Sequence, residues 1–192
     1  MKAPQVYKLL REEIGPWATA QGFKRTKTML SWQRPHGPAH TVFWFQVSRD
    51  GWDAWAGSKF TMEFQVSELP VVGEVSSYRK RLGDFLDDET REEARTIQNQ
   101  IIASLAAPPP DHFLLEDQRL RKWYLAKFKP DARRYSKRDD IWFRYHEPAH
   151  LALWGRFILK RLPECIQEME TATSAAPTPA SDRGRRPWWR FW

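Results

Sequence analysis

The sequence has very little cysteine and no long apolar run. Cys165 is the only cysteine among 192 residues, which excludes an intramolecular disulfide and suits a reducing compartment. No stretch reaches the roughly 18 uninterrupted apolar residues of a transmembrane helix. The first ten residues also lack the apolar core of a signal peptide. We therefore expect a cytoplasmic protein.

A convincing catalytic constellation is missing as well, although one zincin-like pattern occurs. His146, Glu147 and His150 spell H-E-x-x-H. In zincins the two histidines lie on one helix face and bind the same zinc, and the glutamate polarises a metal-bound water. Pro148 instead favours a helix start, which would place His146 and Glu147 before the helix. No third ligand is evident nearby. We predict a helix start and no metal, an expectation that a metal bound by His146 and His150 would reverse.

Two further patterns could be catalytic, but each also has a structural interpretation. Asp53 and Glu63 have the loose spacing of a magnesium-dependent nuclease, but Gln65 stands where a catalytic lysine would be expected. Alternation places Glu63 and Gln65 on the polar side of a strand, so we favour a solvated surface. Cys165 lies on the apolar stripe of a predicted helix, which favours core packing over a nucleophile. We expect no cofactor.

Positive charge is concentrated in two segments. The net charge is +7. Residues 118–144 hold ten Lys or Arg against three Asp, and residues 182–192 hold four Arg against one Asp. The rest of the chain is therefore net negative. Any attraction to phosphate or anionic lipid should involve these two segments.

The first basic segment interleaves cations with aromatic rings. Leu120, Tyr124 and Phe128 share one helical face, so we predict that they are core residues and that the cations form the rim. Such a rim is either solvated or a contact surface for a nucleic acid or protein partner. The candidate partner-binding cations are Arg119, Arg121, Lys122, Arg133, Arg134, Lys137 and Arg138.

Residues 171–192 form an unusual C-terminal tail. Ala, Thr, Ser and Pro dominate its first part, which predicts a flexible linker. Indole rings combine an apolar body with an N–H donor, so the end of the tail could dock on the domain, bind a partner or touch a membrane surface. The candidate binding residues are Arg185, Arg186, Trp188, Trp189, Arg190, Phe191 and Trp192.

Two strand-like segments define the expected fold. Residues 42–48 and 59–67 alternate apolar and polar side chains, the period that buries one face of a sheet, and residues 28–34 add a third strand. We predict an α+β fold, with a small antiparallel sheet, helices packed on one face and a disordered C-terminal tail. Residues 1–170 would form a single domain. Helical periodicity covers residues 4–21, 78–86, 90–105, 116–129 and 148–170.

The loop between the two strongest strands carries Trp52 and Trp55. Large amphipathic rings in a loop can line a pocket or form a protein-binding hot spot, or they can fold over the hydrophobic centre. Trp44, Glu63 and Gln65 share the polar face of the predicted sheet, which the helical second half could close into a pocket. We treat these five residues as possible pocket or hot-spot residues.

Several short motifs resemble a known family. Residues 21–25 read Gln-Gly-Phe-Lys-Arg, residues 45–48 read Phe-Gln-Val-Ser, and residues 79–84 read Arg-Lys-Arg-Leu-Gly-Asp. Their order is similar to the bacterial domain of unknown function family 4304 over roughly residues 6–86. The resemblance implies a helix-flanked antiparallel sheet and supplies no activity. The tail departs from the family pattern.

These observations favour binding over catalysis. We expect a non-catalytic binding module that engages a protein partner through the basic segment and the aromatic tail. A sequence-tolerant RNA- or DNA-binding protein is the alternative, because cations and stacking rings would also suit nucleic acid. A metal-dependent hydrolase or nuclease comes third.

Overall fold

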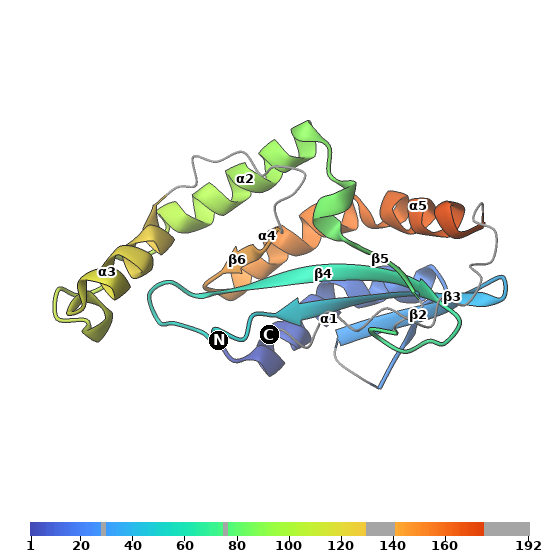
Figure 1. Ribbon diagram of the computed structural model, residues 1–192, viewed down its shortest axis with the longest axis horizontal. Coiled ribbons are helices and arrows are strands. Elements are labelled where there is room, and N and C mark those ends of the chain that lie inside the picture. Colours follow the sequence, from blue (N-terminus) through green and yellow to red (C-terminus); the bar gives the residue numbers. More distant parts are fainter. Residues whose placement is uncertain (28–29, 75–76, 130–140, 175–192) are drawn as a thin grey trace.

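In the computed structural model, the described residues form a six-stranded antiparallel sheet with helices packed on one of its faces (Figure 1). The structure describes residues 1–27, 30–74, 77–129 and 141–174. The strands are β1 (Lys24–Arg25), β2 (Leu30–His36), β3 (Ala39–Val47), β4 (Ser58–Ser67), β5 (Tyr78–Arg81) and β6 (Phe143–Tyr145). The helices are α1 (Ala3–Ala20), η1 (Leu82–Phe85), α2 (Asp88–Ala103), η2 (Phe113–Leu115), α3 (Gln118–Leu125), η3 (Ala126–Phe128), α4 (Pro148–Leu159) and α5 (Leu162–Ser174).

The strand β4 organises the sheet. The order is β1-β2-β3-β4, and the outer edge of β4 pairs with two short strands. Ser58, Lys59 and Phe60 pair with β6, and the segment 63–66 pairs with β5. The predicted antiparallel α+β fold is confirmed, and the sheet is larger than the predicted minimum of three strands.

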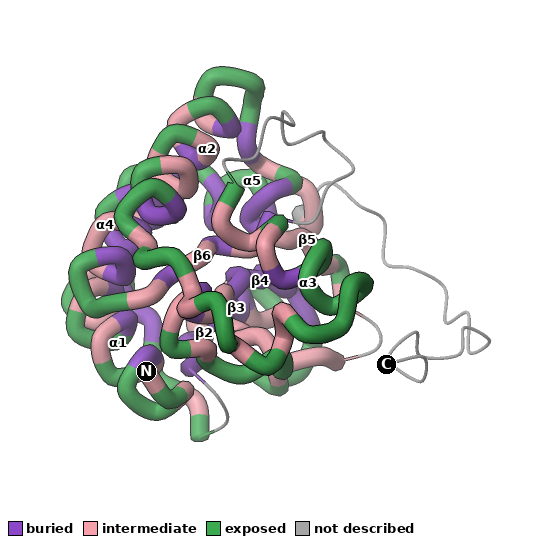
Figure 2. Tube along the Cα trace, turned by 90° about the vertical axis from the view of Figure 1, so that its left-hand side faces the viewer, coloured by how far each residue is buried: buried purple, intermediate pink, exposed green. Residues whose placement is uncertain are grey.

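The hydrophobic core lies between the sheet and the helices α1, α4 and α5. Phe43, Phe60 and Phe64 point from the strands into this layer and are fully buried. They alternate with residues of the opposite face, as the period of two predicts. Phe143 on β6 packs against Trp154 on α4, with ring centroids 4.7 Å apart. Figure 2 shows buried segments where these helices face the strands.

The first helix and its end follow the sequence pattern. Val6, Leu10 and Ile14 form its buried stripe, and Pro16 lies inside the helix. Gly22 has a φ of 76°, and the N–H of the following residue donates to the carbonyl of Ala18 at 2.9 Å. A left-handed residue in this position ends a helix at low cost when it is glycine. Gly22 therefore ends α1.

Two predicted helices differ from the structure. Residues 78–86 form β5 and the 3-10 helix η1 rather than one helix. In β5, Arg79 and Arg81 pair with the Glu63 carboxylate, a tertiary contact that periodicity does not reveal. The predicted helical region 148–170, expected to bend at Pro163, forms the two helices α4 and α5, and Pro163 stands in the first turn of α5, where proline is well tolerated.

The helical part of the chain extends past the predicted domain boundary at residue 170. The last helix, α5, continues to Ser174. The remainder of the predicted tail, residues 175–192, lies outside the described residues.

Two glycines with positive φ allow a matched test of close backbone packing. Gly57 has a φ of 68°, and an added Cβ would lie 2.0 Å from the carbonyl oxygen of Tyr145. Gly37 has a φ of 57° and has no atom within 4 Å of that position. We expect Gly37→Ala to lose about 1 kcal/mol of unfolding free energy through left-handed strain, and Gly57→Ala to lose about 3 kcal/mol or more because β6 must move. Urea unfolding measures both, and equal losses would contradict the close approach.

Candidate binding surface

A short helical segment projects from one end of the molecule (Figure 1). It comprises η2, α3 and η3, and we call residues 112–129 the arm. The arm is helical partly because Asp117 caps α3, accepting hydrogen bonds from the backbone N–H groups of Arg119 and Leu120 at 2.8 and 2.9 Å. A side-chain acceptor at this position satisfies N–H groups that the helix itself leaves unpaired.

Tyr124 anchors the arm to the loop before β4. Its side chain is buried, its hydroxyl donates to the Asp53 carboxylate at 2.8 Å, and its ring stacks on His112. Burial, followed by the hydrogen bond to Asp53, raises the pKa of Tyr124. Burial alone would raise the pKa of Asp53, but hydrogen bonds from Tyr124 and from two backbone N–H groups outweigh it and lower that pKa. Asp53 therefore orders the loop and the arm.

The arm exposes three large apolar side chains. Phe113 is 68% exposed, Trp123 is 53% exposed and Leu120 is 45% exposed. The predicted core position of Leu120 is wrong, whereas that of Tyr124 is confirmed. Tyr124 is the only buried residue of α3, so Leu120, one turn earlier on the same helix face, stays in solvent. Large apolar side chains gathered in solvent mark interaction surfaces.

The arm also exposes cations. Arg119, Arg121 and Lys122 are exposed on α3, as the prediction of a basic rim requires. The ammonium group of Lys127 lies 3.9 Å from the centroid of the Trp123 ring, a cation–π contact that holds the indole in place. The other predicted binding cations and the tail residues lie outside the described residues: Arg133, Arg134, Lys137, Arg138, Arg185, Arg186, Trp188, Trp189, Arg190, Phe191 and Trp192.

The loop before β4 presents one of its two tryptophans. Trp52 is 42% exposed and stacks on His146, with ring centroids 5.8 Å apart. Nε2 of His146 lies 2.7 Å from the carbonyl oxygen of Ala54, a hydrogen bond that holds the imidazole ring against the loop. Trp55 is half-buried. Neither indole belongs to the hydrophobic core cluster. Trp52 thus remains a candidate contact residue, close to the anchored end of the arm.

A small basic pocket lies where the loop, the arm and the sheet meet. Its volume is about 60 Å³, and it brings together Lys59 of β4, Lys127 of the arm and Arg144 of β6, with Asp50 and Asp53. The guanidinium of Arg144 also donates to the carbonyl of Lys127 at 2.6 Å. The sequence did not indicate this convergence, because the three cations come from three separate elements.

The H-E-x-x-H residues make structural contacts. Helix α4 begins at Pro148, as predicted. Nδ1 of His150 accepts hydrogen bonds from the backbone N–H groups of His146 and Glu147, at 3.1 and 3.4 Å. His150 therefore completes the helix start. Over the residues that the structure describes, no group of three His, Cys, Asp or Glu side chains lies close enough to hold a metal ion.

The second sheet face is packed rather than solvated. Trp44, Glu63 and Gln65 are at most 4% exposed, so the predicted solvated strand face is wrong. The Glu63 carboxylate pairs with Arg79 at 2.5 Å and Arg81 at 3.3 Å, and Arg79 also lies over the Trp44 ring. The Gln65 amide bonds to the loop that follows β4. Burial of Glu63 is possible because two cations compensate its charge.

Cys165 packs in the core, as predicted. It is 2% exposed, and burial raises the pKa of its thiol to about 12. The thiolate form, which is the nucleophile, is therefore strongly disfavoured near neutral pH.

Comparison with known proteins adds no assignment to this surface. No protein-family model, no curated protein and no solved structure matches the chain. The resemblance to domain of unknown function family 4304 stays a prediction. None of the helices in the described part of the chain is long and apolar enough to span a membrane.

His150 makes stability depend on pH. Burial, partly offset by Glu147 and reinforced by His146, lowers its pKa below 6.5, so the unfolded chain binds a proton that the folded imidazole resists. We expect its contribution to the unfolding free energy to be constant above pH 7 and to fall as the pH drops below 6.5. Two groups face Nε2 of His150. The Glu147 carboxylate lies 3.5 Å from it, and the Ser104 hydroxyl lies 3.4 Å from it.

The measurement is urea unfolding of the wild type and of His150→Asn between pH 5 and 8. Asparagine keeps an acceptor near the position of Nδ1 but does not titrate in this range. The difference in unfolding free energy between the wild type and His150→Asn should shrink towards acid pH. A constant difference would show that protonation of His150 is not coupled to unfolding.

The Tyr124 anchor can be tested by removing its hydroxyl. Tyr124→Phe deletes a hydrogen bond to a carboxylate, and we expect a loss of about 1–3 kcal/mol in unfolding free energy. A double-mutant cycle with Asp53→Asn should show coupling between the two positions. Hydrogen exchange of the loop amides of Trp55 and Ala56 should also accelerate. Additive losses would show that the contact does not hold the arm.

Proposed function

We propose that this protein is a non-catalytic binding module that engages a protein partner through the arm and the aromatic tail. The observation that carries the proposal is the exposure of Phe113, Leu120 and Trp123 on one short helical segment beside exposed cations. Aromatic residues and Arg are enriched in protein interfaces, and Trp and Arg dominate their hot spots. The tail adds four Arg and further indole rings to the same chemistry.

The surroundings of the arm indicate the chemistry of the partner. Arg119, Lys122 and Lys127 lie on the same short segment as the apolar side chains. A complementary surface would have an apolar centre and an acidic rim. The Tyr124 anchor and the contact between Lys127 and Trp123 hold the arm in place before binding. A pre-ordered contact surface loses less conformational entropy when a partner binds.

Nucleic acid is the second candidate, and one observation favours it. Lys59, Lys127 and Arg144 converge on the basic pocket beside the arm. Burial, with Arg144 and Lys59 as like charges, lowers the pKa of Lys127 against the opposing effect of Asp53. An added phosphate would relieve this repulsion, and Trp123 offers a ring for base stacking.

Other charged residues favour a protein partner over nucleic acid. Asp50 and Asp53 line the same basic pocket and offset most of its positive charge. Asp111, Glu116 and Asp117 lie on or next to the arm, so the arm offers a surface of mixed charge and not a continuous cationic track for a phosphate backbone. The apolar side chain of Leu120 also has no stacking surface for a base.

The first test removes apolar surface from the arm. In a pull-down from host lysate with nuclease treatment, Leu120→Ser/Trp123→Ala should recover about tenfold less of the partner than the wild type, because each interface hot spot contributes more than 1 kcal/mol. The matched control is Leu69→Ser/Val71→Ser, which removes equally exposed apolar residues from another loop. A third full-length variant, Trp188→Ala/Trp189→Ala/Trp192→Ala, tests the tail.

The recovered partner is then bound to each purified variant. Equal affinities for the arm variant, the control and the wild type would refute a role of the arm. Loss only in the tail variant would assign binding to the tail alone. Unchanged urea midpoints for all variants verify that the fold is intact.

The second test addresses nucleic acid directly. Lys59→Gln/Lys127→Gln removes two of the converging cations. If this pocket binds phosphates, affinity for a fluorescent oligothymidylate should fall, and the slope of log affinity against log salt should shrink by about 1.4, since each single-strand phosphate contact contributes about 0.7. Salt-insensitive or absent binding by the wild type would remove the nucleic-acid candidate.

A further inference from the structure

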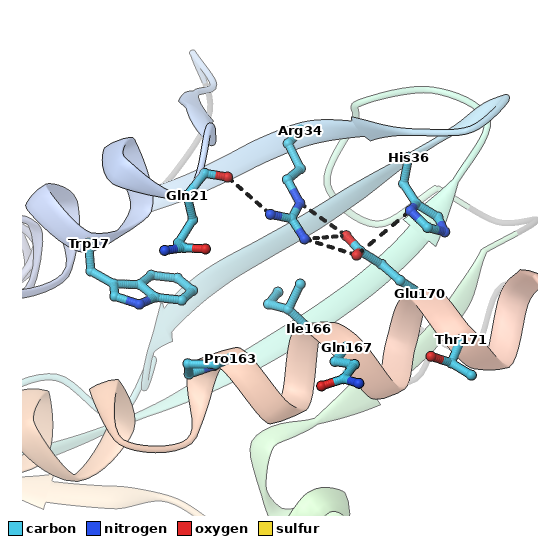
Figure 3. A pocket seen from close by; sticks show the side chains of 9 residues that line it. All are labelled: Trp17, Gln21, Arg34, His36, Pro163, Ile166, Gln167, Glu170 and Thr171. Atoms are coloured by element: carbon cyan, nitrogen blue, oxygen red, sulfur yellow. Dashed lines mark hydrogen bonds and ion pairs between the residues drawn. The ribbon is translucent and has the colours of Figure 1, made fainter.

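A larger pocket lies on the other part of the molecule, along α5 (Figure 3). Its volume is about 460 Å³, within the range of about 300–1,000 Å³ that is typical of small-ligand sites. The end of α1, the end of β2 and one side of α5 form its walls. The arm and its basic pocket contribute none of the lining residues. This site is therefore separate from the arm and its basic pocket.

One wall of the pocket is apolar. Trp17 of α1 faces Pro163 and Ile166 of α5 across the opening (Figure 3). The Trp17 ring is held from behind by Phe23, with which it stacks at a centroid distance of 6.3 Å. A fixed indole beside aliphatic side chains offers one flat face, which suits a planar aromatic ring.

The charges at the other end of the pocket compensate each other. Arg34 donates three hydrogen bonds to the Glu170 carboxylate, from Nε to Oε1 at 3.1 Å and from Nη2 to each oxygen at 2.9 Å. Thr41 donates to the same carboxylate at 2.7 Å, and Nδ1 of His36 lies 3.7 Å from it. Because Glu170 balances Arg34, the pocket has little net charge to attract an anion or a cation. The occupant that fits this balance is neutral.

Two side-chain amides supply polar groups without charge. Gln21 and Gln167 line the pocket from α1's end and from α5, and both are exposed (Figure 3). Each amide carries a carbonyl acceptor and two N–H donors. The two amides lie on different walls, so a ligand that reaches both presents polar groups at two positions of its ring, as a pyridine carboxamide does (Figure 3).

We propose that this pocket binds a neutral planar heteroaromatic ring that carries a carboxamide-like edge. The ring lies against Trp17 above Pro163 and Ile166, and its polar groups bond to Gln21 on one wall and to Gln167 on the other. The compensated pair of Arg34 and Glu170 closes the far end and discriminates against charged analogues, which would meet an unmatched opposite or like charge there.

The test uses three probes with the same ring and different charge. Nicotinamide is neutral, nicotinate is an anion, and 1-methylnicotinamide is a cation. Titration of the ¹⁵N-labelled full chain should shift the side-chain amide signals of Gln21 and Gln167, which are assigned by their loss in the alanine variants. Because nicotinamide is a small ligand, the pocket should bind it with a Kd of about 1–10 mM. The charged analogues should bind at least about fivefold more weakly.

Matched variants locate the site. Gln167→Ala should weaken nicotinamide binding by about fivefold, the effect of one hydrogen bond. Glu164→Ala, an exposed change on the same helix outside the pocket lining, should leave it unchanged. Both positions are exposed, so neither variant threatens the core.

Three results would overturn the proposal. The first is the absence of shifts at Gln21 and Gln167 up to 50 mM nicotinamide, a limit set at about five times the weakest expected Kd. The second is equal binding of the three probes. The third is displacement of these two signals, without any ligand, in the full-length Trp188→Ala/Trp189→Ala/Trp192→Ala variant, which would show that the chain's own indoles fill the pocket.

Discussion

The pairing of β4 with three other strands is the constraint on which the rest of the structure depends. One edge of β4 pairs with β3 along nearly its whole length, and the opposite edge is divided between β6 and β5. This division brings the chain around residue 80 and the chain around residue 144 to the same strand. The arm leaves the body between them, and α4 starts directly after β6. The arm and the basic pocket beside it are therefore positioned by one strand.

The sequence predicted the elements whose pattern is local. Alternating apolar residues located β3 and β4, and the stripe of Val6, Leu10 and Ile14 located α1, because burial of one face imposes those periods. Residues 78–86 were predicted wrongly as a helix because Arg79 and Arg81 owe their extended conformation to a carboxylate on β4. The residues 78–86 alone do not reveal a partner that is this far away in the sequence.

Burial on the second sheet face shows the same limit. Polar side chains at alternate positions of β4 ordinarily predict solvent. Here Glu63 has its charge compensated by two guanidinium groups and Gln65 has its amide satisfied by a neighbouring loop, so both lie inside the protein. Composition contains the partners, but only the register of β5 brings them opposite.

The candidate sites were predictable in unequal measure. The exposed cations Arg119 and Lys122 follow from charge clustering along the chain, and Trp52 follows from an unusual loop. Convergence of Lys59 and Arg144 could not be predicted, because these residues are far apart in the sequence and meet only through the β4–β6 pairing. The pocket along α5 was not predicted either, since three separate elements form it.

The placement of Cys165 gives the chain a built-in reporter of its own opening. The only thiol in 192 residues lies in the packed layer beneath the sheet, where it is shielded from solvent and kept protonated. An alkylating reagent would reach it only in molecules in which α5 has moved away from the strands. Labelling kinetics at this one sulfur would therefore read out motions of the wall that carries the larger pocket, without any engineered probe.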